Sequence, residues 1–128
     1  MIMGIGIDIA EVSRFKKWTC NQGLLEKYFN KNELEQINNK GNFTCFSLAA
    51  RFAGKEAFGK ALGLGLKGIR LKDIAILNDF NGKPEIKLTG SALNAFNKIG
   101  ADKLHISLTH EKEFAAALVI IEKSTDSP

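Results

Sequence analysis

The amino-acid sequence predicts an α+β fold in which a mostly antiparallel sheet packs against one long helix. Short apolar segments typical of strands occur at the start of the chain and again in its second half, where two pairs are each joined by a turn. Between them, residues 42–62 form one extended segment that favours helix and contains no proline. The expected order is therefore a strand, helices, two strands, a helix and two strands.

Each element has its own local pattern. The apolar IGIDI run predicts a short buried strand over residues 2–9, and helices follow over 11–18 and 23–29. In NKNELEQINN, Asn32 is expected to cap a helix, because asparagine accepts hydrogen bonds from the free amides of a helix start. The later elements are a strand over 71–77, a hairpin whose Asn81-Gly82 turn leads to a strand opened by Pro84, a helix over 90–100, and strands over 104–109 and 114–122.

Size and composition are those of one globular domain. The chain has 128 residues, of which 45% are hydrophobic and 25% charged, and we expect one domain over residues 1–123 and a flexible tail over 124–128. No apolar run approaches the roughly 18 residues that a membrane helix needs. Cys20 and Cys45 lack metal-ligand spacing and are expected to be reduced. These features predict a cytoplasmic protein with no membrane partner.

The charge balance permits an anionic partner without identifying one. The formal net charge is +4, which is compatible with a ligand or protein rich in phosphate or carboxylate. No long block of lysine and arginine is present, so a nucleic-acid partner is not expected.

A carboxylate stands in the first strand, in the stretch GIGIDI. Alternation along a strand gives two faces, with Ile5, Ile7 and Ile9 on one and Gly4, Gly6 and Asp8 on the other. Glycines on the second face allow another backbone or a ligand to approach closely. Asp8 is therefore either a functional carboxylate beside that approach or a cap for the following helix.

The long helix carries a row of residues at four-residue spacing. Phe52, Glu56 and Lys60 lie one above another on this row, and Arg51 and Lys55 lie on the neighbouring one. One interpretation is a surface ion pair between Glu56 and Lys60, which contributes little to stability. The other is a carboxylate at the edge of a cleft, beside cations that face a phosphate.

The stretch HISLTH forms a polar strand face. His105, Ser107 and Thr109 alternate onto one side, so this side either faces water or forms the wall of a site. His110 follows at the turn, where we expect no direct role for it.

Four segments in this order carry a family resemblance: MIMGIGIDIAEVSRF, RFAGKEAFGKALG, NGKPEI and HISLTHEKEFAAALVIIE. Together they resemble the holo-acyl-carrier-protein synthases, the short bacterial 4'-phosphopantetheinyl transferases. The resemblance implies that family's fold and its reaction. Coenzyme A gives its 4'-phosphopantetheine group to a serine of an apo acyl carrier protein, in support of fatty acid biosynthesis, and adenosine 3',5'-bisphosphate leaves.

The resemblance also assigns roles to residues. It places catalysis on Asp8, Glu56 and Lys60, with Mg²⁺ held by the two carboxylates. The expected coenzyme A contacts are Arg51, Lys60, Gly63, Pro84, His105 and Thr109. The carrier protein is expected to bind Arg14, Lys17, Trp18 and Lys27, although these also fit a solvated basic helix face with Trp18 in the core.

The family implies a homotrimer with active sites between subunits. In this chain the loop NNKGNF holds only Lys40 where relatives carry several basic residues, so the 3'-phosphate contact is in question there. Two other functions fit the same residues: a magnesium-dependent enzyme of phosphate chemistry, such as a pyrophosphate hydrolase, and a non-catalytic basic binding module.

Overall fold

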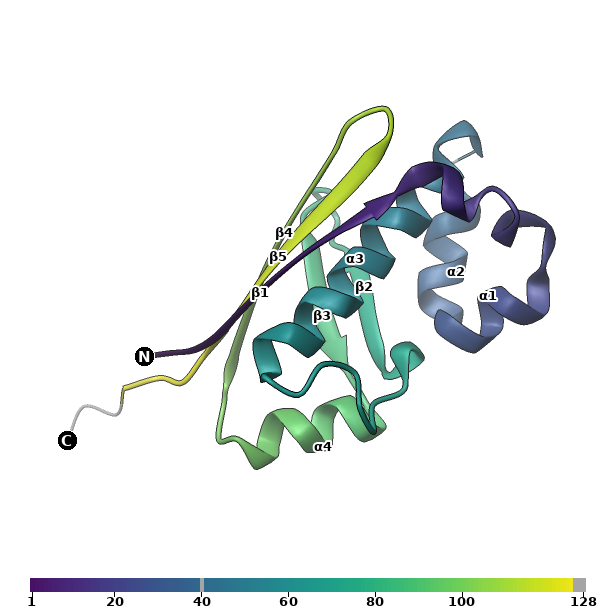
Figure 1. Cartoon of the computed structure of the whole chain (residues 1–128). Coiled ribbons are helices and arrows are strands. Elements are labelled where there is room, and N and C mark those ends of the chain that lie inside the picture. Colours follow the sequence, from purple (N-terminus) through teal and green to yellow (C-terminus); the bar gives the residue numbers. More distant parts are fainter. Residues whose placement is uncertain (40, 126–128) are drawn as a thin grey trace.

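The computed structural model describes residues 1–39 and 41–125, with only the backbone of Asn42, and confirms an α+β fold (Figure 1). The helices are α1 (Gln22–Tyr28), α2 (Lys31–Asn38), α3 (Thr44–Leu62) and α4 (Gly90–Lys98). The strands are β1 (Ile2–Glu11), β2 (Ile74–Asn78), β3 (Pro84–Leu88), β4 (Lys103–His110) and β5 (Phe114–Glu122). Among the described residues, no helix is both long and apolar enough to cross a bilayer.

The strands form two antiparallel sheets. In the first, β5 lies between β1 and β4, and β2 and β3 form a separate hairpin. Figure 1 shows α3 lying along the larger sheet, with α1 and α2 together beyond one end of it. The start of β1 is tied to the end of the central strand β5, since the Met1 amino group donates to the Lys123 carbonyl at 2.7 Å. The antiparallel arrangement is as predicted.

Glycines let α3 come unusually close to β1. A Cβ atom built on Gly4 would lie 1.8 Å from the Ala61 carbonyl oxygen, and one on Gly6 would lie 1.8 Å from that of Ala57. Such a separation is far inside van der Waals contact, so no larger residue fits either position without moving the helix. The face predicted from Gly4, Gly6 and Asp8 is therefore the face that meets α3.

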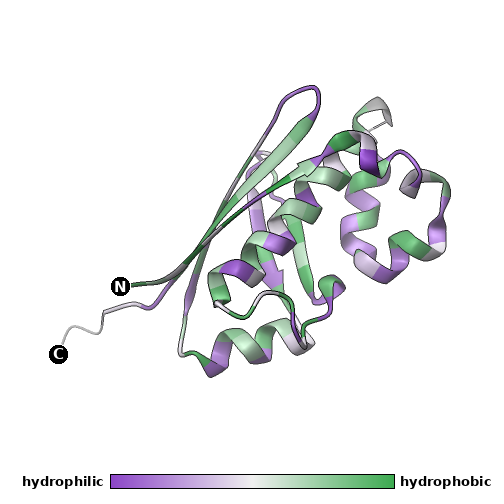
Figure 2. Cartoon of the chain, viewed as in Figure 1, coloured by the Kyte–Doolittle hydropathy of each residue, from purple (hydrophilic) through white to green (hydrophobic). Residues whose placement is uncertain are grey.

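The core lies between α3 and the larger sheet. Ala115, Ala117, Val119 and Ile121 point from β5 to the helix and are buried. Figure 2 shows hydrophobic residues along β5 and α3, whereas the turn between β4 and β5 is hydrophilic. Small residues on both elements explain how the helix and sheet approach so closely.

The opposite face of the sheet is apolar and exposed in the single chain. Ile5, Ile7 and Ile9 remain 59%, 65% and 63% exposed. Their register partners on β5 are Ile120, Leu118 and Ala116, and the partners of those on β4 are His105, Ser107 and Thr109. We call these nine residues the outer sheet face. The expected buried strand is thus covered on one side only.

Three local expectations were wrong. The helix expected over residues 11–18 is replaced by two short 3₁₀ turns, because the Val12 amide still pairs with the Glu113 carbonyl at 2.8 Å. Asn30, rather than Asn32, caps α2, and its capping box with Glu33 satisfies amides at both positions. The strand expected over residues 71–77 begins only at Ile74, after a 3₁₀ turn.

The spacing along the helix suggested that Lys55 faces a phosphate, but the structure places it in a buried ion pair instead. Its side chain is fully buried, and its ammonium lies 2.6 Å from Glu33 Oε1 and 2.9 Å from the Leu71 carbonyl. The other oxygen of Glu33 accepts the Ile76 amide at 3.0 Å. Burial lowers the pKa of Lys55, and the Glu33 carboxylate opposes that shift. The pair joins α2, α3 and β2.

Removing one member of this pair is expected to destabilise the fold. In Lys55→Met, Glu33 remains as a buried carboxylate without its cation, which costs about 3–5 kcal/mol. Urea denaturation followed by circular dichroism measures the loss. The same substitution at the exposed Lys98 of α4 is the control and should change stability by less than about 0.5 kcal/mol. Equal stability of the two variants contradicts the expectation.

Candidate active site

Three charged side chains meet where β1 lies against α3. The Lys60 ammonium donates to Asp8 Oδ1 at 2.9 Å and to the Ile7 carbonyl at 3.0 Å. Lys60 therefore pairs across to the strand and makes no ion pair with Glu56, its neighbour on the helix row. The Lys60 side chain is 53% exposed and that of Asp8 is 19% exposed, so both can be reached from solvent.

Glu56 belongs to the same cluster. Partial burial raises its pKa, and repulsion from the Asp8 carboxylate raises it further, while Lys60 and Arg14 oppose the shift. Two carboxylates thus lie close enough to repel one another, beside two cations. Among the described residues, no group of three or more histidine, cysteine or acidic side chains is placed to hold a metal ion. The carboxylate oxygens of this cluster come from Asp8 and Glu56.

Apart from this charged cluster, a cavity with a volume of about 430 Å³ opens beside the carboxyl half of β2. Six of the residues that line it are Phe46, Ser47, Arg51, Asn78, Pro84 and His110, and we call it the Arg51 recess. The Phe46 and His110 rings lie 5.1 Å apart between centroids. Aromatic walls next to a guanidinium suit a ligand with a flat ring and an anionic group.

Arg51 is a buried cation at the edge of this recess. Its side chain is 3% exposed, and its hydrogen bonds go to neutral acceptors: the Ile76 carbonyl, Ser47 Oγ and Gln36 Oε1. The nearby Glu33 carboxylate is already paired with Lys55. Two cations and one carboxylate in the trio of Arg51, Lys55 and Glu33 leave one formal positive charge over.

The other expected coenzyme A contacts are spread more widely. His105 lies on the outer sheet face, 2.5 Å from Glu122 Oε1, and this hydrogen bond lowers the pKa of Glu122. Thr109 lies on the same face. Gly63 ends α3 with φ of 82°, a left-handed conformation that favours glycine. Of the expected coenzyme A contacts, only Arg51 and Pro84 line the Arg51 recess within one chain.

Sequence analysis missed His110, which was expected to have no direct role. The structure places it in the recess with Arg51 and Pro84, whereas His105 points to the opposite side of β4. The sequence did contain a signal: side chains alternate between the two faces of a strand, so His105 and His110, at odd and even positions, point to opposite faces. The expectation about Lys40 lies outside the described residues.

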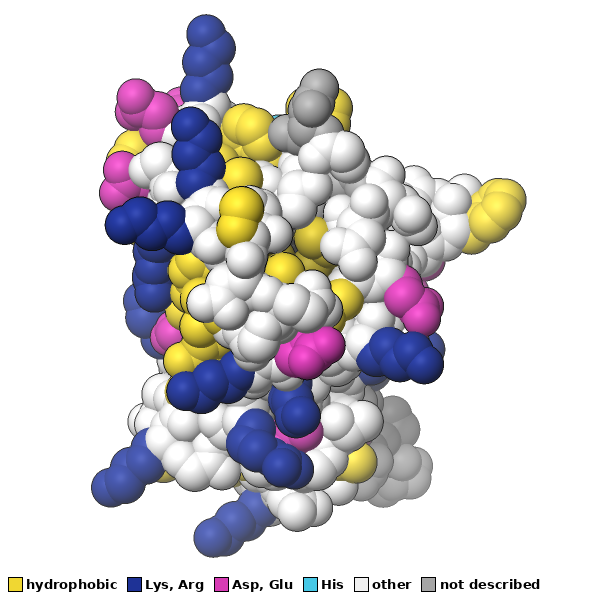
Figure 3. All heavy atoms as spheres, turned by 90° about the vertical axis from the view of Figure 1, so that its right-hand side faces the viewer, with side chains coloured by type: hydrophobic (Ala, Val, Ile, Leu, Met, Phe, Trp, Pro, Cys, Tyr) yellow, Lys and Arg dark blue, Asp and Glu magenta, His cyan; other side chains and the backbone are white. Residues whose placement is uncertain are grey.

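The expected carrier-protein residues belong to α1 and to the segment between β1 and α1, on the right-hand side of Figure 1. This side faces the viewer in Figure 3, where lysine and arginine side chains line one edge. Arg14 is held with its guanidinium 4.8 Å from the Phe52 ring centre. Lys17 and Lys27 are exposed. Trp18 instead packs against the core, with its ring 4.8 Å from that of Phe15. Trp18 thus matches the alternative in which it serves packing.

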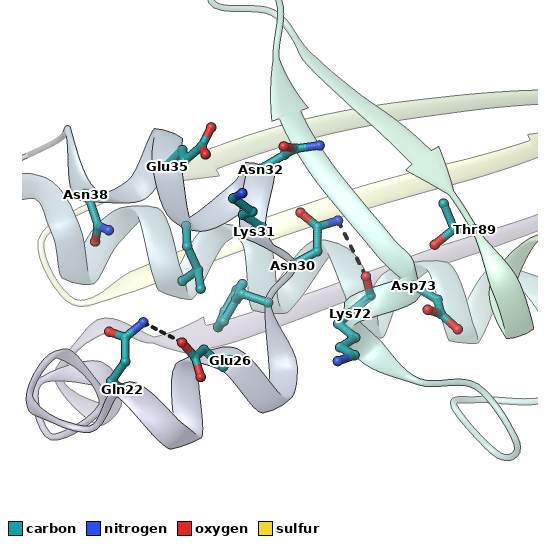
Figure 4. A pocket seen from close by; sticks show the side chains of 12 residues that line it. Gln22, Glu26, Asn30, Lys31, Asn32, Glu35, Asn38, Lys72, Asp73 and Thr89 are labelled. Carbon is teal, nitrogen blue, oxygen red and sulfur yellow. Dashed lines mark hydrogen bonds between the residues drawn. The ribbon is translucent and has the colours of Figure 1, made fainter.

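A larger cavity lies elsewhere. It has a volume of about 830 Å³ and lies between α1, α2 and the turn before β2 (Figure 4). Its wall includes Glu26, Asn30 and Lys72, and Asn30 donates to the Lys72 carbonyl across it at 3.5 Å. None of the site residues expected from the sequence lines this cavity. Size alone therefore does not mark the active site.

Comparison with known proteins shows the family to which the chain belongs. The family model of the 4'-phosphopantetheinyl transferase superfamily matches residues 4–119, and the chain belongs to that superfamily. The chain is 58% identical to a holo-[acyl-carrier-protein] synthase of Treponema denticola, covering 95% of this chain and 99% of the relative. It is 49% identical to the one from Trichlorobacter lovleyi, covering 95% and 98%.

Solved structures show the same fold. The crystal structure of the holo-[acyl-carrier-protein] synthase from Neisseria meningitidis has a TM-score of 0.87 at 32% identity and covers 96% of this chain and 100% of its own. The Bacillus anthracis synthase, solved in complex with CoA (3',5'-ADP), has a TM-score of 0.80 at 36% identity and covers 97% and 99%.

Proposed function

We propose that this chain is a holo-acyl-carrier-protein synthase. It transfers 4'-phosphopantetheine from coenzyme A to a serine of an apo acyl carrier protein, in support of fatty acid biosynthesis. The observation that carries the proposal is the cluster of Asp8, Glu56 and Lys60 where β1 meets α3. It occurs in a chain that matches such synthases over nearly its whole length.

Asp8 and Glu56 fit a magnesium ion. Both offer carboxylate oxygens, the ligands that this hard cation prefers, and a cation between them relieves the repulsion that raises the pKa of Glu56. Few protein ligands are needed, because magnesium is usually held by one or two carboxylates together with substrate phosphate. When bound, the ion supplies positive charge to the pyrophosphate oxygens.

The chain's own residues then orient the reaction. Lys60 holds Asp8 through its ammonium, and the exposed part of its side chain complements the negative charge of the pyrophosphate. Proton removal from the serine hydroxyl falls either to a carboxylate of the cluster or to a water that it orients. The serine oxygen forms a bond to the β-phosphorus of coenzyme A while the bond from that phosphorus to the leaving phosphate oxygen breaks.

The Arg51 recess is the proposed site of the nucleotide part of coenzyme A. Arg51 provides a surplus positive charge for a phosphate, and Pro84, Phe46 and His110 provide flat apolar surface for adenine. Lys60 and Gly63 lie farther along α3, on the side of the carboxylates. His105 and Thr109 remain proposed contacts that reach the ligand from a neighbouring subunit.

A homotrimer provides that neighbour. The outer sheet face presents three exposed isoleucines beside Leu118 and Ile120, a patch that a soluble monomer seldom leaves uncovered. The same face carries His105 and Thr109. Copies of this chain that cover the face would therefore bring these two residues to the site of an adjacent subunit.

A charge in the outer sheet face is expected to break the trimer. In Ile5→Glu the side chain is exposed in the isolated chain, so folding is unaffected, but in an interface it becomes a buried carboxylate without a partner. Light scattering coupled to chromatography should show a monomer, with transfer activity reduced at least about tenfold. Leu93→Glu, on the exposed side of α4, is the matched control. A monomeric, fully active parent protein contradicts the assembly.

The carrier protein is proposed to dock on the basic surface formed by Arg14, Lys17 and Lys27, with Trp18 supporting it from the core. Opposite charge chiefly raises the rate of association and sets orientation. A cytoplasmic location is also proposed, and the two free cysteines are compatible with a reducing compartment.

The products of coenzyme A test the function against its closest alternative. Chromatography of a reaction containing coenzyme A and magnesium should show adenosine 3',5'-bisphosphate only when apo acyl carrier protein is added. Release of this nucleotide without any carrier indicates a hydrolase that uses water as the acceptor. Binding of coenzyme A without cleavage under either condition indicates a binding module.

A further inference from the structure

Gln36 uses its whole side-chain amide to connect two walls of the Arg51 recess. Its Oε1 accepts from Arg51 Nη2 at 2.8 Å and from the Asn78 amide at 2.9 Å. Its Nε2 donates to the Asn78 carbonyl at 3.0 Å. Gln36 does not line the recess itself, but it bonds directly to two residues that do.

The contact with Asn78 replaces a missing strand. Asn78 ends β2 and pairs with Pro84 across the hairpin. In the described part of the chain, no further strand pairs with the other side of β2. There the Gln36 side chain bonds to both the amide and the carbonyl of Asn78, as a neighbouring strand would. The Pro84 wall of the recess is therefore fixed to α2 through one side chain.

The contact with Arg51 fixes a guanidinium that pairs with no carboxylate among the residues the structure describes. Nε and Nη1 are held by the Ile76 carbonyl and Ser47, and Gln36 holds the remaining nitrogen. A neutral amide holds the guanidinium in position without cancelling its charge. A glutamate at position 36 would hold it equally well but would neutralise the charge that an anionic ligand meets.

We propose that Gln36 is a positioning residue for the nucleotide part of coenzyme A, which holds Arg51 and the β2–β3 hairpin in their binding geometry and leaves the charge of Arg51 available. This inference rests on the proposed function. Because neither Asp8 nor Glu56 lines the recess, Gln36 is expected to act on the affinity for coenzyme A and to leave the chemical step unchanged.

Binding of adenosine 3',5'-bisphosphate tests the inference without any carrier protein. Calorimetric titration of the parent protein and of Gln36→Leu should show about tenfold weaker binding in the variant, the effect expected when a hydrogen bond to a charged group is lost. In the transfer assay, KM for coenzyme A should rise by a similar factor, with kcat within about twofold of the parent. Unchanged nucleotide affinity in the folded variant overturns the inference.

Two further variants separate positioning from general stability. Ile37→Val removes a methylene from the neighbouring buried residue of α2, so it loosens the helix without touching the recess. This variant should leave both the nucleotide affinity and the KM for coenzyme A unchanged. A rise in KM equal to that of Gln36→Leu overturns the inference. Gln36→Glu keeps an acceptor for Arg51 and should still weaken binding, because it cancels the charge. Unchanged affinity in this variant also counts against the proposal.

Failure of the proposed function gives a different result. If the parent protein itself neither binds adenosine 3',5'-bisphosphate nor uses coenzyme A, the function is wrong and the role of Gln36 falls with it. If the parent binds and transfers normally while the Gln36 variants match it, only the role of Gln36 is wrong.

Discussion

Glu56→Gln is expected to reduce the rate of phosphopantetheine transfer by about two to three orders of magnitude, the loss seen when a group that stabilises transition-state charge is removed. The amide keeps the shape of the side chain but offers magnesium a neutral oxygen in place of a charged one. Its half-buried position beside Asp8 suggests that the fold survives, since the change removes a repulsion. Initial rates at saturating magnesium measure the effect.

Glu35→Gln provides the matched control for this variant. Glu35 is exposed on α2 and lies outside the carboxylate cluster, so the same substitution there should leave the rate unchanged. Circular dichroism establishes that both variants are folded. Full activity of Glu56→Gln would show that the carboxylate cluster is not the catalytic site.

Gly6→Ala is expected to destabilise the protein by at least about 3 kcal/mol, at the upper end of the usual cost of overpacking. The added methyl group would lie 1.8 Å from the Ala57 carbonyl oxygen, so α3 must move away from β1. The helix carries Glu56 and Lys60, whereas the strand carries Asp8. The same displacement therefore separates the cluster, and transfer activity should fall together with stability.

Gly23→Ala distinguishes this effect from a general cost of replacing glycine. Gly23 lies in α1, where the nearest atom to an added Cβ is 3.7 Å away, and alanine favours helix by up to about 1 kcal/mol. Chemical denaturation should show equal or higher stability for this control. If Gly6→Ala matches it, the close approach of α3 and β1 is not a requirement of the fold.

Strand alternation was the most informative signal in the sequence. It correctly separated Gly4, Gly6 and Asp8 from the three isoleucines, because side-chain parity along a strand is fixed by backbone geometry alone. It did not show which face the rest of the chain covers. The isoleucine face was expected to be buried and is exposed, since burial depends on what packs against a strand.

Local patterns failed where distant contacts decided the structure. Residues 11–18 favour helix, yet the Val12 amide pairs with Glu113, about a hundred positions away in the chain, and Phe15 enters the core. Helical spacing likewise placed Lys55 beside Arg51 on one row but did not reveal Glu33, which holds Lys55 from another helix. Such partners are determined by the tertiary fold, which local spacing does not encode.

The candidate site was predicted in part. The carboxylates and Lys60 were found from spacing and resemblance, and the structure brings them together. The Arg51 recess was less predictable, because His110, which lines it, and Gln36, which holds Arg51, come from other segments of the sequence. The proposed contribution of the outer sheet face, with His105, would depend on a neighbouring copy, which no local pattern encodes.

The most direct test of the proposed function is the intact mass of an apo acyl carrier protein after incubation with this protein, coenzyme A and magnesium. We expect the carrier to gain one phosphopantetheine group, to gain none when a chelator removes magnesium, and to be modified far more slowly when Glu56→Gln replaces the parent. An unchanged carrier mass, with coenzyme A cleaved or left intact, would contradict the assignment of this chain as a phosphopantetheinyl transferase.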